Sequence, residues 1–203
     1  KNLAHDTNIL KNKKMLSGKT AFITGSNRGI GKAICDLYKS KDYLCHGVSK
    51  SEGLDVDKDC DAIVQQMANF KYIVLNAYAK DSQLRMLKAI IDLYKNDEKH
   101  VAVITSTSGT QAGMDSSLKQ QEYNWYCKNK KALIEYIEKV QQDLYEKPIQ
   151  IFDVCPDTVR TDMSKGLWEE YPKLQAQEVA DCVEMCFTKP YNINKIVLQK
   201  YDS

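Results

Sequence analysis

The sequence predicts an α/β fold in which helices cover both faces of a doubly wound parallel sheet. Short runs of β-branched and aromatic residues alternate with segments whose apolar residues recur every three or four positions. The 203 residues are enough for one substantial core, and neither an internal repeat nor a low-complexity linker divides them. We therefore expect one domain over residues 16–203, preceded by a polar extension over residues 1–15.

Each element of this fold has its own segment of sequence. The apolar runs predict six strands, at Thr20–Thr24, Tyr43–Val48, Tyr72–Asn76, Val101–Thr105, Ile149–Val154 and Lys195–Leu198. Helical periodicity between them predicts helices around Ile30–Leu37, Ile63–Phe70, Leu84–Ile91, Leu133–Leu144 and Val179–Phe187.

One interval breaks the alternation. Only five residues, 49–53, separate the second apolar run from Leu54-Asp55-Val56, whereas a parallel crossover needs about ten to twelve residues. We therefore expect a shortened region after the second strand, where a helix and a strand are missing.

Composition argues against several classes of function. A formal charge of +2, with Lys and acidic residues interspersed, argues against a nucleic-acid partner, and no apolar run has the length of a membrane span. The seven cysteines are odd in number and include no CxxC pair, which is typical of reduced thiols, so we expect a cytoplasmic protein. The three histidines show no ligand spacing relative to them, and we expect no metal site.

A glycine-rich turn, Thr24-Gly25-Ser26-Asn27-Arg28-Gly29-Ile30-Gly31, follows the first strand and leads into a helix. Glycines allow a tight turn and a close approach to a pyrophosphate, and the free N–H groups at a helix start favour its negative charge. This order of strand, turn and helix predicts a Rossmann-like dinucleotide site. The expected contacts are Gly25, Ser26, Asn27, Arg28, Gly29, Ile30 and Gly31.

The spacing TGxxxGxG at this position resembles the short-chain dehydrogenase/reductase family, and further segments match that family in order over roughly residues 16–198. They are Leu75-Asn76-Ala77, Ile104-Thr105-Ser106-Thr107-Ser108-Gly109, the YxxxK segment Tyr126 to Lys130, and Val154 to Met163. A YxxxK match alone means little, since Tyr191 to Lys195 gives a second one. The order of the segments is the stronger signal, and the chain is identified as a shortened member of the family.

The resemblance implies a set of roles. Tyr126 would be the acid, Ser106 would hydrogen-bond the substrate oxygen, and Lys130 would bond the nicotinamide ribose. A phenol has an ordinary pKa of about 10, so a nearby cation such as Lys130 is expected to stabilise the phenolate. The resemblance also places further residues at the cofactor, namely Asn76, Ala77, Pro156, Val159 and Thr161.

Some positions depart from the family pattern. Tyr78 stands where the family has a glycine, and no convincing counterpart of the helical asparagine that often completes the catalytic set is found; Asp81 or Ser82 falls nearest. The long interval between Ser106 and Tyr126 predicts an inserted loop over residues 111–122. The covering segment over residues 163–174 is short, which predicts an open or small substrate pocket.

The residue after the second strand bears on the choice of dinucleotide, because NAD is usually bound there by an acidic side chain. This chain has Ser49 and Lys50 at that point, and Arg28 lies in the glycine turn, so we expect NADP(H) to be preferred, with NAD(H) possible. Glu52 and Asp55 are the competing acids. By resemblance Asp55, with Val56 beside it, meets the adenine edge instead.

The hypothesis is therefore an NADP(H)-dependent oxidoreductase that transfers a hydride between nicotinamide and a small carbonyl or alcohol substrate. The alternative is a non-catalytic NADP(H)-binding sensor or interaction protein on the same fold; epimerase or dehydratase chemistry also stays open, since fold does not fix function. Family members commonly pair through helices that would include Leu84–Tyr94 and Ala132–Glu146, so a homodimer or homotetramer is expected.

Overall fold

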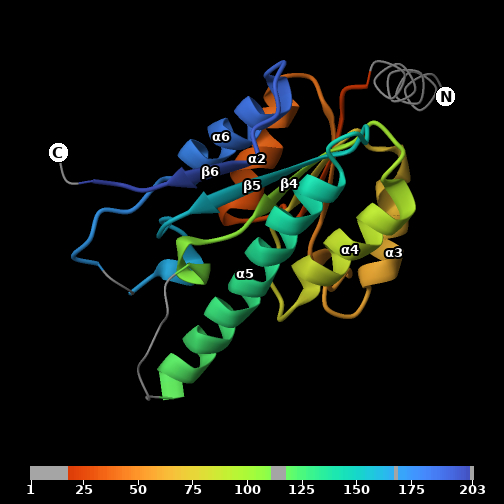
Figure 1. Ribbon diagram of the computed structural model, residues 1–203. Coiled ribbons are helices and arrows are strands. Elements are labelled where there is room, and N and C mark those ends of the chain that lie inside the picture. The colour runs from red at the N-terminus through yellow and green to blue at the C-terminus, as the bar shows by residue number, and fades with distance from the viewer. Residues whose placement is uncertain (1–17, 111–117, 167–168, 202–203) are drawn as a thin grey trace.

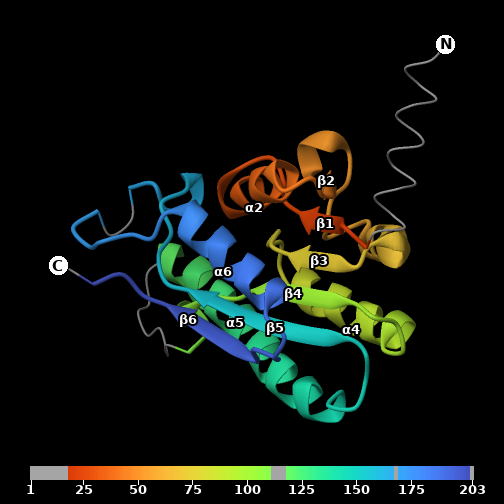
Figure 2. The same cartoon turned by 90° about the horizontal axis from the view of Figure 1, so that it is seen from above.

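Six parallel strands form one sheet in the order β2-β1-β3-β4-β5-β6. Figure 1 shows the sheet from the side, and the strand order can be followed in Figure 2. The computed structural model describes residues 18–110, 118–166 and 169–201. The strands are β1 (Thr20–Thr24), β2 (Leu44–Val48), β3 (Tyr72–Leu75), β4 (His100–Ile104), β5 (Gln150–Pro156) and β6 (Lys195–Leu198). The prediction of a parallel α/β sheet is confirmed.

Helices cover both faces of this sheet, as Figure 2 shows from above. On one face lie α2 (Gly29–Ser40) and α6 (Ala176–Thr188), and on the other lie α3 (Cys60–Gln66), α4 (Ser82–Tyr94) and α5 (Leu118–Asp143). Both faces of β1 and β3 are therefore buried, which explains why these strands read as continuous apolar runs. Short 3₁₀ turns complete the chain: η1 (Lys50–Glu52), η2 (Met67–Asn69), η3 (Thr107–Gly109) and η4 (Asp162–Ser164).

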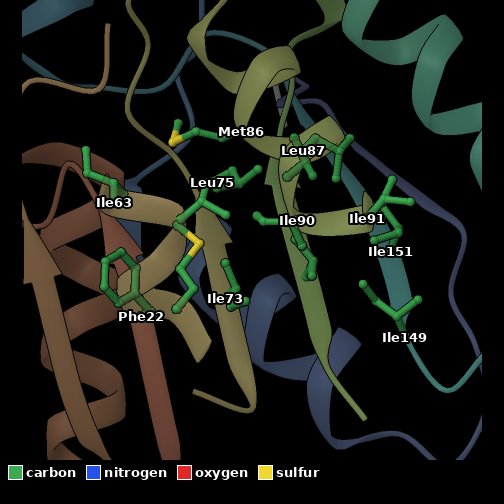
Figure 3. Close-up of a cluster of buried hydrophobic side chains, with 14 of the residues drawn as sticks. Phe22, Ile63, Ile73, Leu75, Met86, Leu87, Ile90, Ile91, Ile149 and Ile151 are labelled. Carbon is green, nitrogen blue, oxygen red and sulfur yellow. The ribbon is translucent and has the colours of Figure 1, made fainter. Parts of the chain in front are cut away.

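The larger hydrophobic core lies between the sheet and α3, α4 and α5. Alternate residues of a strand point to opposite faces, so Phe22 joins this core while Ala21 and Ile23 join the smaller one under α2 and α6. Figure 3 shows the larger core, whose side chains include Phe22, Ile63, Ile73, Leu75, Met86, Leu87, Ile90, Ile91, Ile149 and Ile151.

The shortened region after the second strand is confirmed. The common doubly wound order is 3-2-1-4-5-6, whereas here the third strand in sequence pairs with β1 on the side away from β2. Between β2 and α3 the chain forms only η1 and turns. As a result, β2 is an edge strand.

Part of the expected inserted loop is helical instead. The helix α5 already begins at Leu118, so residues 118–122 belong to it, while residues 111–117 lie outside the described residues. The expected N-terminal extension over residues 1–15 also lies outside them. None of the helices in the described ranges is both long and apolar enough to cross a membrane.

Candidate cofactor and catalytic site

The strand order reverses between β1 and β3, and ligands of such sheets bind at the carboxyl ends of the strands where this happens. Thr24 ends β1, and its hydroxyl accepts hydrogen bonds from the backbone N–H groups of Asn76 and Ala77, at 2.9 and 3.0 Å. The Asn76 amide donates in return to the carbonyl oxygens of Thr24 and Gly25, at 3.1 and 3.3 Å. These bonds fix the glycine turn to β3 and also explain why β3 ends before Asn76.

The glycine turn has the shape of an anion cradle. Gly25 has φ +71°, and a Cβ on Gly31 would lie 2.0 Å from the carbonyl oxygen of Gly25, so side chains are excluded from both positions. Arg28 caps α2 and is exposed, as is Asn27, which donates to the hydroxyl of Ser51. The first turn of α2, all of it described, carries no acidic residue. Its unpaired N–H groups and positive dipole end therefore favour a phosphate.

The remaining two residues of the turn, Ser26 and Ile30, pack toward the interior of the protein. Ser26 is buried, and Ile30 packs against the smaller core. A ligand in the glycine turn would meet the backbone of these two residues rather than their side chains.

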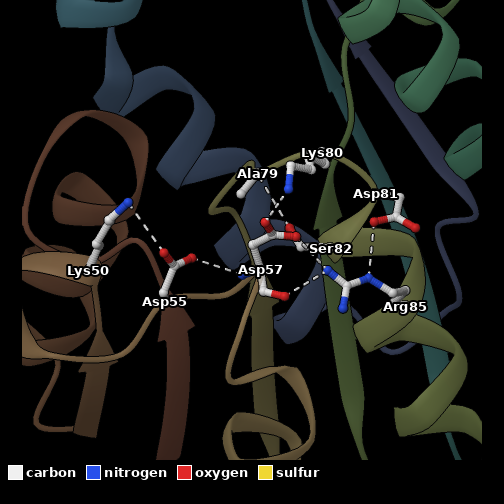
Figure 4. Close-up of polar contacts among 8 residues, drawn as sticks. All are labelled: Lys50, Asp55, Asp57, Ala79, Lys80, Asp81, Ser82 and Arg85. Carbon is white, nitrogen blue, oxygen red and sulfur yellow. Dashed lines mark hydrogen bonds and ion pairs between the residues drawn. The ribbon is translucent and has the colours of Figure 1, made fainter.

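The end of β2 combines hydroxyl groups with paired charges, and Figure 4 shows the pair of Lys50 and Asp55. Ser49 donates to the carboxylate of Glu52 at 2.5 Å, and the Lys50 ammonium lies 3.3 Å from the Asp55 carboxylate. The backbone N–H of residue 57, and then Lys50, hold the pKa of Asp55 below its ordinary value. Lys50 is 84% exposed, whereas Val56 packs its side chain in the larger core, so only the backbone of Val56 is available to an adenine.

Lys130 lies on α5 and is almost completely buried. Its ammonium donates to the Gln83 side-chain oxygen and to the Ile104 carbonyl oxygen, both at 2.7 Å. Burial lowers the pKa of Lys130 to about 7, although the Asp153 carboxylate acts in the opposite direction. Near neutral pH this lysine therefore exists in both its charged and its neutral form.

Tyr126 lies one helical turn before Lys130, with its ring among other aromatic rings. The Tyr126 ring meets the Tyr78 ring edge-on, with 4.8 Å between the ring centres, and stacks against the Tyr123 ring, with 6.4 Å between the centres. Burial raises the pKa of Tyr126 to about 12, although a hydrogen bond with Ser106 acts in the opposite direction. The structure thus brings Tyr126 and Ser106 into contact, from α5 and from the end of β4.

The expected effect of Lys130 on the phenol differs from what this geometry gives. The Lys130 ammonium lies 5.5 Å from the centre of the Tyr126 ring, and its hydrogen bonds go to other groups. Because burial dominates, the pKa of Tyr126 rises instead of falling. The side chains are adjacent as expected, but stabilisation of the phenolate is not seen in this structure.

The turn η3 positions Ser106 against α5. A Cβ on Gly109 would lie 2.9 Å from the backbone of Lys130, so the turn packs directly on the helix. Ser106 caps η3 by accepting the backbone N–H of Ser108 at 3.2 Å, and the Ser108 hydroxyl accepts from Tyr123 at 3.1 Å. The two serines therefore meet different tyrosines, which distinguishes their roles.

The segment after β5 returns to the glycine turn. Pro156 ends β5, and Val159 pairs with Leu174. A methyl carbon of Thr161 would lie 3.2 Å from a Cβ on Gly29, so Thr161 borders the phosphate cradle. The structure thereby brings both ends of the predicted cofactor site together.

Gln83 is a site residue that the sequence analysis missed. Besides accepting from Lys130, its amide donates to the carbonyl oxygens of Leu75 and Ile104, at 2.7 and 3.0 Å. It links the ends of β3 and β4 to the lysine. The available signal was a large polar residue on the apolar face of α4, in register with Met86, Leu87 and Ile90.

Asp81 and Ser82, which fall nearest to the expected helical asparagine in the sequence, make their contacts with other groups (Figure 4). Asp81 pairs with Arg85 at 3.0 Å, and the Ser82 hydroxyl accepts the backbone N–H of Ala79 at 3.2 Å. Arg85 also pairs with Asp57 at 2.8 Å, which ties α4 to the loop before α3. The contacts of Asp81 and Ser82 are thus structural.

Comparison with known proteins shows which proteins this chain resembles. No family model matches the chain. Among curated proteins it is 30% identical over 110 residues to the 3-oxoacyl-[acyl-carrier-protein] reductase FabG of Haemophilus influenzae, which covers 53% of this chain and 42% of that protein. It is also 26% identical over 113 residues to an uncharacterized oxidoreductase of Staphylococcus epidermidis, over 55% of this chain and 46% of that one. The matches span less than half of these relatives.

Solved structures extend the likeness to most of the chain. A short-chain dehydrogenase from Burkholderia cenocepacia in complex with NADP superposes with a TM-score of 0.74 at 14% identity, covering 89% of this chain and 88% of that one. The chain has the fold of the short-chain dehydrogenases. A short-chain dehydrogenase/reductase from Vibrio parahaemolyticus gives 0.69 at 19% identity, over 88% and 98%. The fold that the resemblance of the sequence motifs implied is thereby confirmed.

Within the short-chain dehydrogenase fold, the motif residues of this chain gather at one edge of the sheet. The described residues contain no group of three side chains arranged as metal ligands. The side chains that meet at this edge are those of Ser106, Tyr126 and Lys130, close to the glycine turn.

Proposed function

We propose that the protein is an NADP(H)-dependent oxidoreductase that transfers a hydride between nicotinamide and a small carbonyl or alcohol substrate. The observation that carries the proposal is the convergence of Ser106, Tyr126 and Lys130, from two elements, at the sheet edge that also holds the glycine turn. The names of curated relatives support an oxidoreductase, and some structural neighbours hold NADP.

The residues present fit a dinucleotide. The glycine turn and the start of α2 would hold the pyrophosphate, with Asn76, Ala77 and Thr161 bordering the nicotinamide half. Ser49, Lys50 and Arg28 would meet a 2′-phosphate on the adenine ribose, and the residues at 55–56 would meet the adenine. When bound, the reduced nicotinamide supplies the hydride for a carbonyl carbon.

The side chains of the chain itself would handle the oxygen and the proton. Because its pKa is raised, Tyr126 stays protonated at neutral pH and can donate its hydroxyl proton to the carbonyl oxygen during reduction. Ser106, already within hydrogen-bond reach of that hydroxyl, would hold the same oxygen. In its charged form Lys130 uses two of its three N–H donors on Gln83 and Ile104, which leaves one for the site.

The assembly follows the same resemblance. We propose a homodimer or homotetramer in the cytoplasm, paired through α4 and α5. Leu93 is 60% exposed on α4, which gives this surface an apolar contact to offer. Sedimentation of the purified chain would test it, and a monomer at micromolar concentration would contradict it.

The direct test replaces Tyr126 by Phe, which removes the proton donor and keeps the ring. We expect turnover of small aldehydes and ketones with NADPH to fall by about 10²- to 10⁴-fold, because general acid catalysis contributes that much. The affinity for NADPH should change less than about twofold, since the phosphate contacts stay intact. Steady-state rates and fluorescence titration measure the two quantities.

Tyr123→Phe is the matched control, since its ring stacks on Tyr126 and its hydroxyl bonds Ser108. It should keep most of the activity. Full activity of Tyr126→Phe would overturn the assignment. A wild-type protein that binds NADPH but turns over no carbonyl compound would instead favour the sensor hypothesis.

A further inference from the structure

Two thiols lie in contact on the side of the sheet opposite to the catalytic residues. Cys35 is in the middle of α2 and is 4% exposed, and Cys45 is on the edge strand β2 and is half-buried. Their Sγ atoms are 3.0 Å apart, only about 1 Å longer than a disulfide bond. All seven cysteines are among the described residues and are free.

The surroundings favour one thiolate in this pair. Cys35 and Cys45 are hydrogen-bonded to each other, and Lys39 follows Cys35 one helical turn later on α2. Cys45 and Lys39 lower the pKa of Cys35, while the pKa of Cys45 is raised. In such a pair an oxidant reacts with the thiolate, and the neighbouring thiol then forms a disulfide with the oxidised sulfur.

We propose that Cys35 and Cys45 form a reversible intramolecular disulfide that fastens the edge strand β2 to α2. With a peroxide as oxidant, the Cys35 thiolate attacks the O–O bond and becomes a sulfenic acid with release of hydroxide. Cys45 then attacks the sulfenic sulfur, the S–S bond forms, and water leaves. In total, two thiols lose two electrons and two protons, and peroxide becomes two waters. A dithiol reductant reverses the reaction.

The position of the pair gives the bond a structural effect. Among the described residues β2 pairs with β1 alone, and no strand flanks its other side. An edge strand held on one side opens more easily than a central one. A bond from β2 to the buried face of α2 closes a short loop and restrains that opening.

The sequence supplies a clean readout, since Lys39 and Lys41 separate the two cysteines. Trypsin therefore releases residues 33–39 and 42–50 as different peptides, which stay joined only if the disulfide is present. After mild treatment with hydrogen peroxide, we expect free thiols to fall from seven to five, the joined peptide to appear in mass spectrometry, and dithiothreitol to remove it. The thermal midpoint should rise on oxidation.

Cys182→Ser is the matched control, because Cys182 is a free thiol on α6 that does not belong to the pair of Cys35 and Cys45. This variant should still lose two thiols. Cys45→Ser and Cys35→Ser should each lose the joined peptide and the rise in midpoint. Overoxidation of Cys35 without a joined peptide, or joined peptides from other cysteines, would overturn the proposal. No cofactor enters these measurements, so they are independent of the proposed activity.

Discussion

The two halves of the candidate site occupy the same edge of the sheet but differ in their exposure to water. In the catalytic half, Ser106 is 8% and Lys130 is 3% exposed, and their hydrogen bonds are made within the protein. In the dinucleotide half, Arg28 is exposed and Lys50 is 84% exposed. The fold has already desolvated the first half, whereas a ligand must desolvate the second.

This difference decides how each half responds to change. Burial shifts the pKa values of Tyr126 and Lys130 in the catalytic half, so substitutions there alter stability and pH dependence together. The ion pair between Lys50 and Asp55 is exposed to water and contributes little to stability, so it is easily exchanged for a phosphate. Substitutions in the dinucleotide half should therefore change binding and leave stability nearly unchanged.

The largest effect is expected from the double substitution Arg28→Ala and Lys50→Ala. Charge-assisted hydrogen bonds contribute about 1.5 to 3 kcal/mol each, so NADPH binding should weaken by about 10²-fold or more. NADH lacks the 2′-phosphate, and its affinity should change far less. Titration of both dinucleotides against both proteins measures the preference.

Lys32→Ala is the control for this comparison. Lys32 is a cation on α2, the helix that Arg28 caps, and its ammonium pairs with Asp36. The substitution should leave the affinity for NADPH unchanged. Tighter binding of NADH than NADPH by the wild type would remove the basis of the NADP(H) assignment.

Gln83→Leu should give the next largest effect. It removes one of the two hydrogen bonds of the Lys130 ammonium, which keeps its bond to Ile104, and takes the Gln83 donor from the carbonyl oxygen of Leu75, at about 1 to 3 kcal/mol for each group. We expect the free energy of unfolding to fall by about 3 kcal/mol in urea titrations. Gln141→Leu is the matched control, since Gln141 also bonds strand carbonyls but lies far from the site and partly in water.

Gln141→Leu should lower the free energy of unfolding by about 1 kcal/mol and keep the wild-type dependence of stability on pH. If Gln83→Leu and Gln141→Leu lowered the free energy of unfolding equally, Gln83 would only bond backbone carbonyl groups and would have no special effect on Lys130.

The smallest effect concerns the pH dependence of stability. The pKa of Lys130 is about 7 in the folded protein and 10.5 when unperturbed, so between these values the unfolded chain binds more protons. Stability must then rise with pH over this window, and the charge on Lys130 costs most below about pH 7. Relative to Lys130→Met, the wild type should gain about 2 kcal/mol from pH 7 to pH 9.

Urea unfolding of both proteins across this range measures the difference. Parallel curves would mean that Lys130 keeps an ordinary pKa and remains hydrated.

Local pattern was sufficient to predict most of the fold. Thr20–Thr24 and Lys195–Leu198 are strands with the predicted bounds, because burial and β-branched composition are visible in a few consecutive residues. The start of α5 was missed because residues 118–122 are mostly polar and lack apolar periodicity, although they favour a helix.

The site was predictable where it rests on short motifs and not where it rests on tertiary contacts. The glycine turn, Ser106 and the Tyr126 to Lys130 segment are each continuous in sequence. Gln83 is 47 residues from Lys130, and its role depends on the packing of α4 against α5. The direction of the Tyr126 pKa shift also depends on burial, which no spacing of residues specifies.

A crystal structure of the chain with bound NADP⁺ tests the central claim most directly, namely that the exposed and the buried half form one site. We expect the pyrophosphate at the glycine turn, the 2′-phosphate at Arg28 and Lys50, and the nicotinamide ring beside Ser106 and Tyr126. A dinucleotide bound with its nicotinamide away from Tyr126, or bound outside this edge of the sheet, would contradict the account.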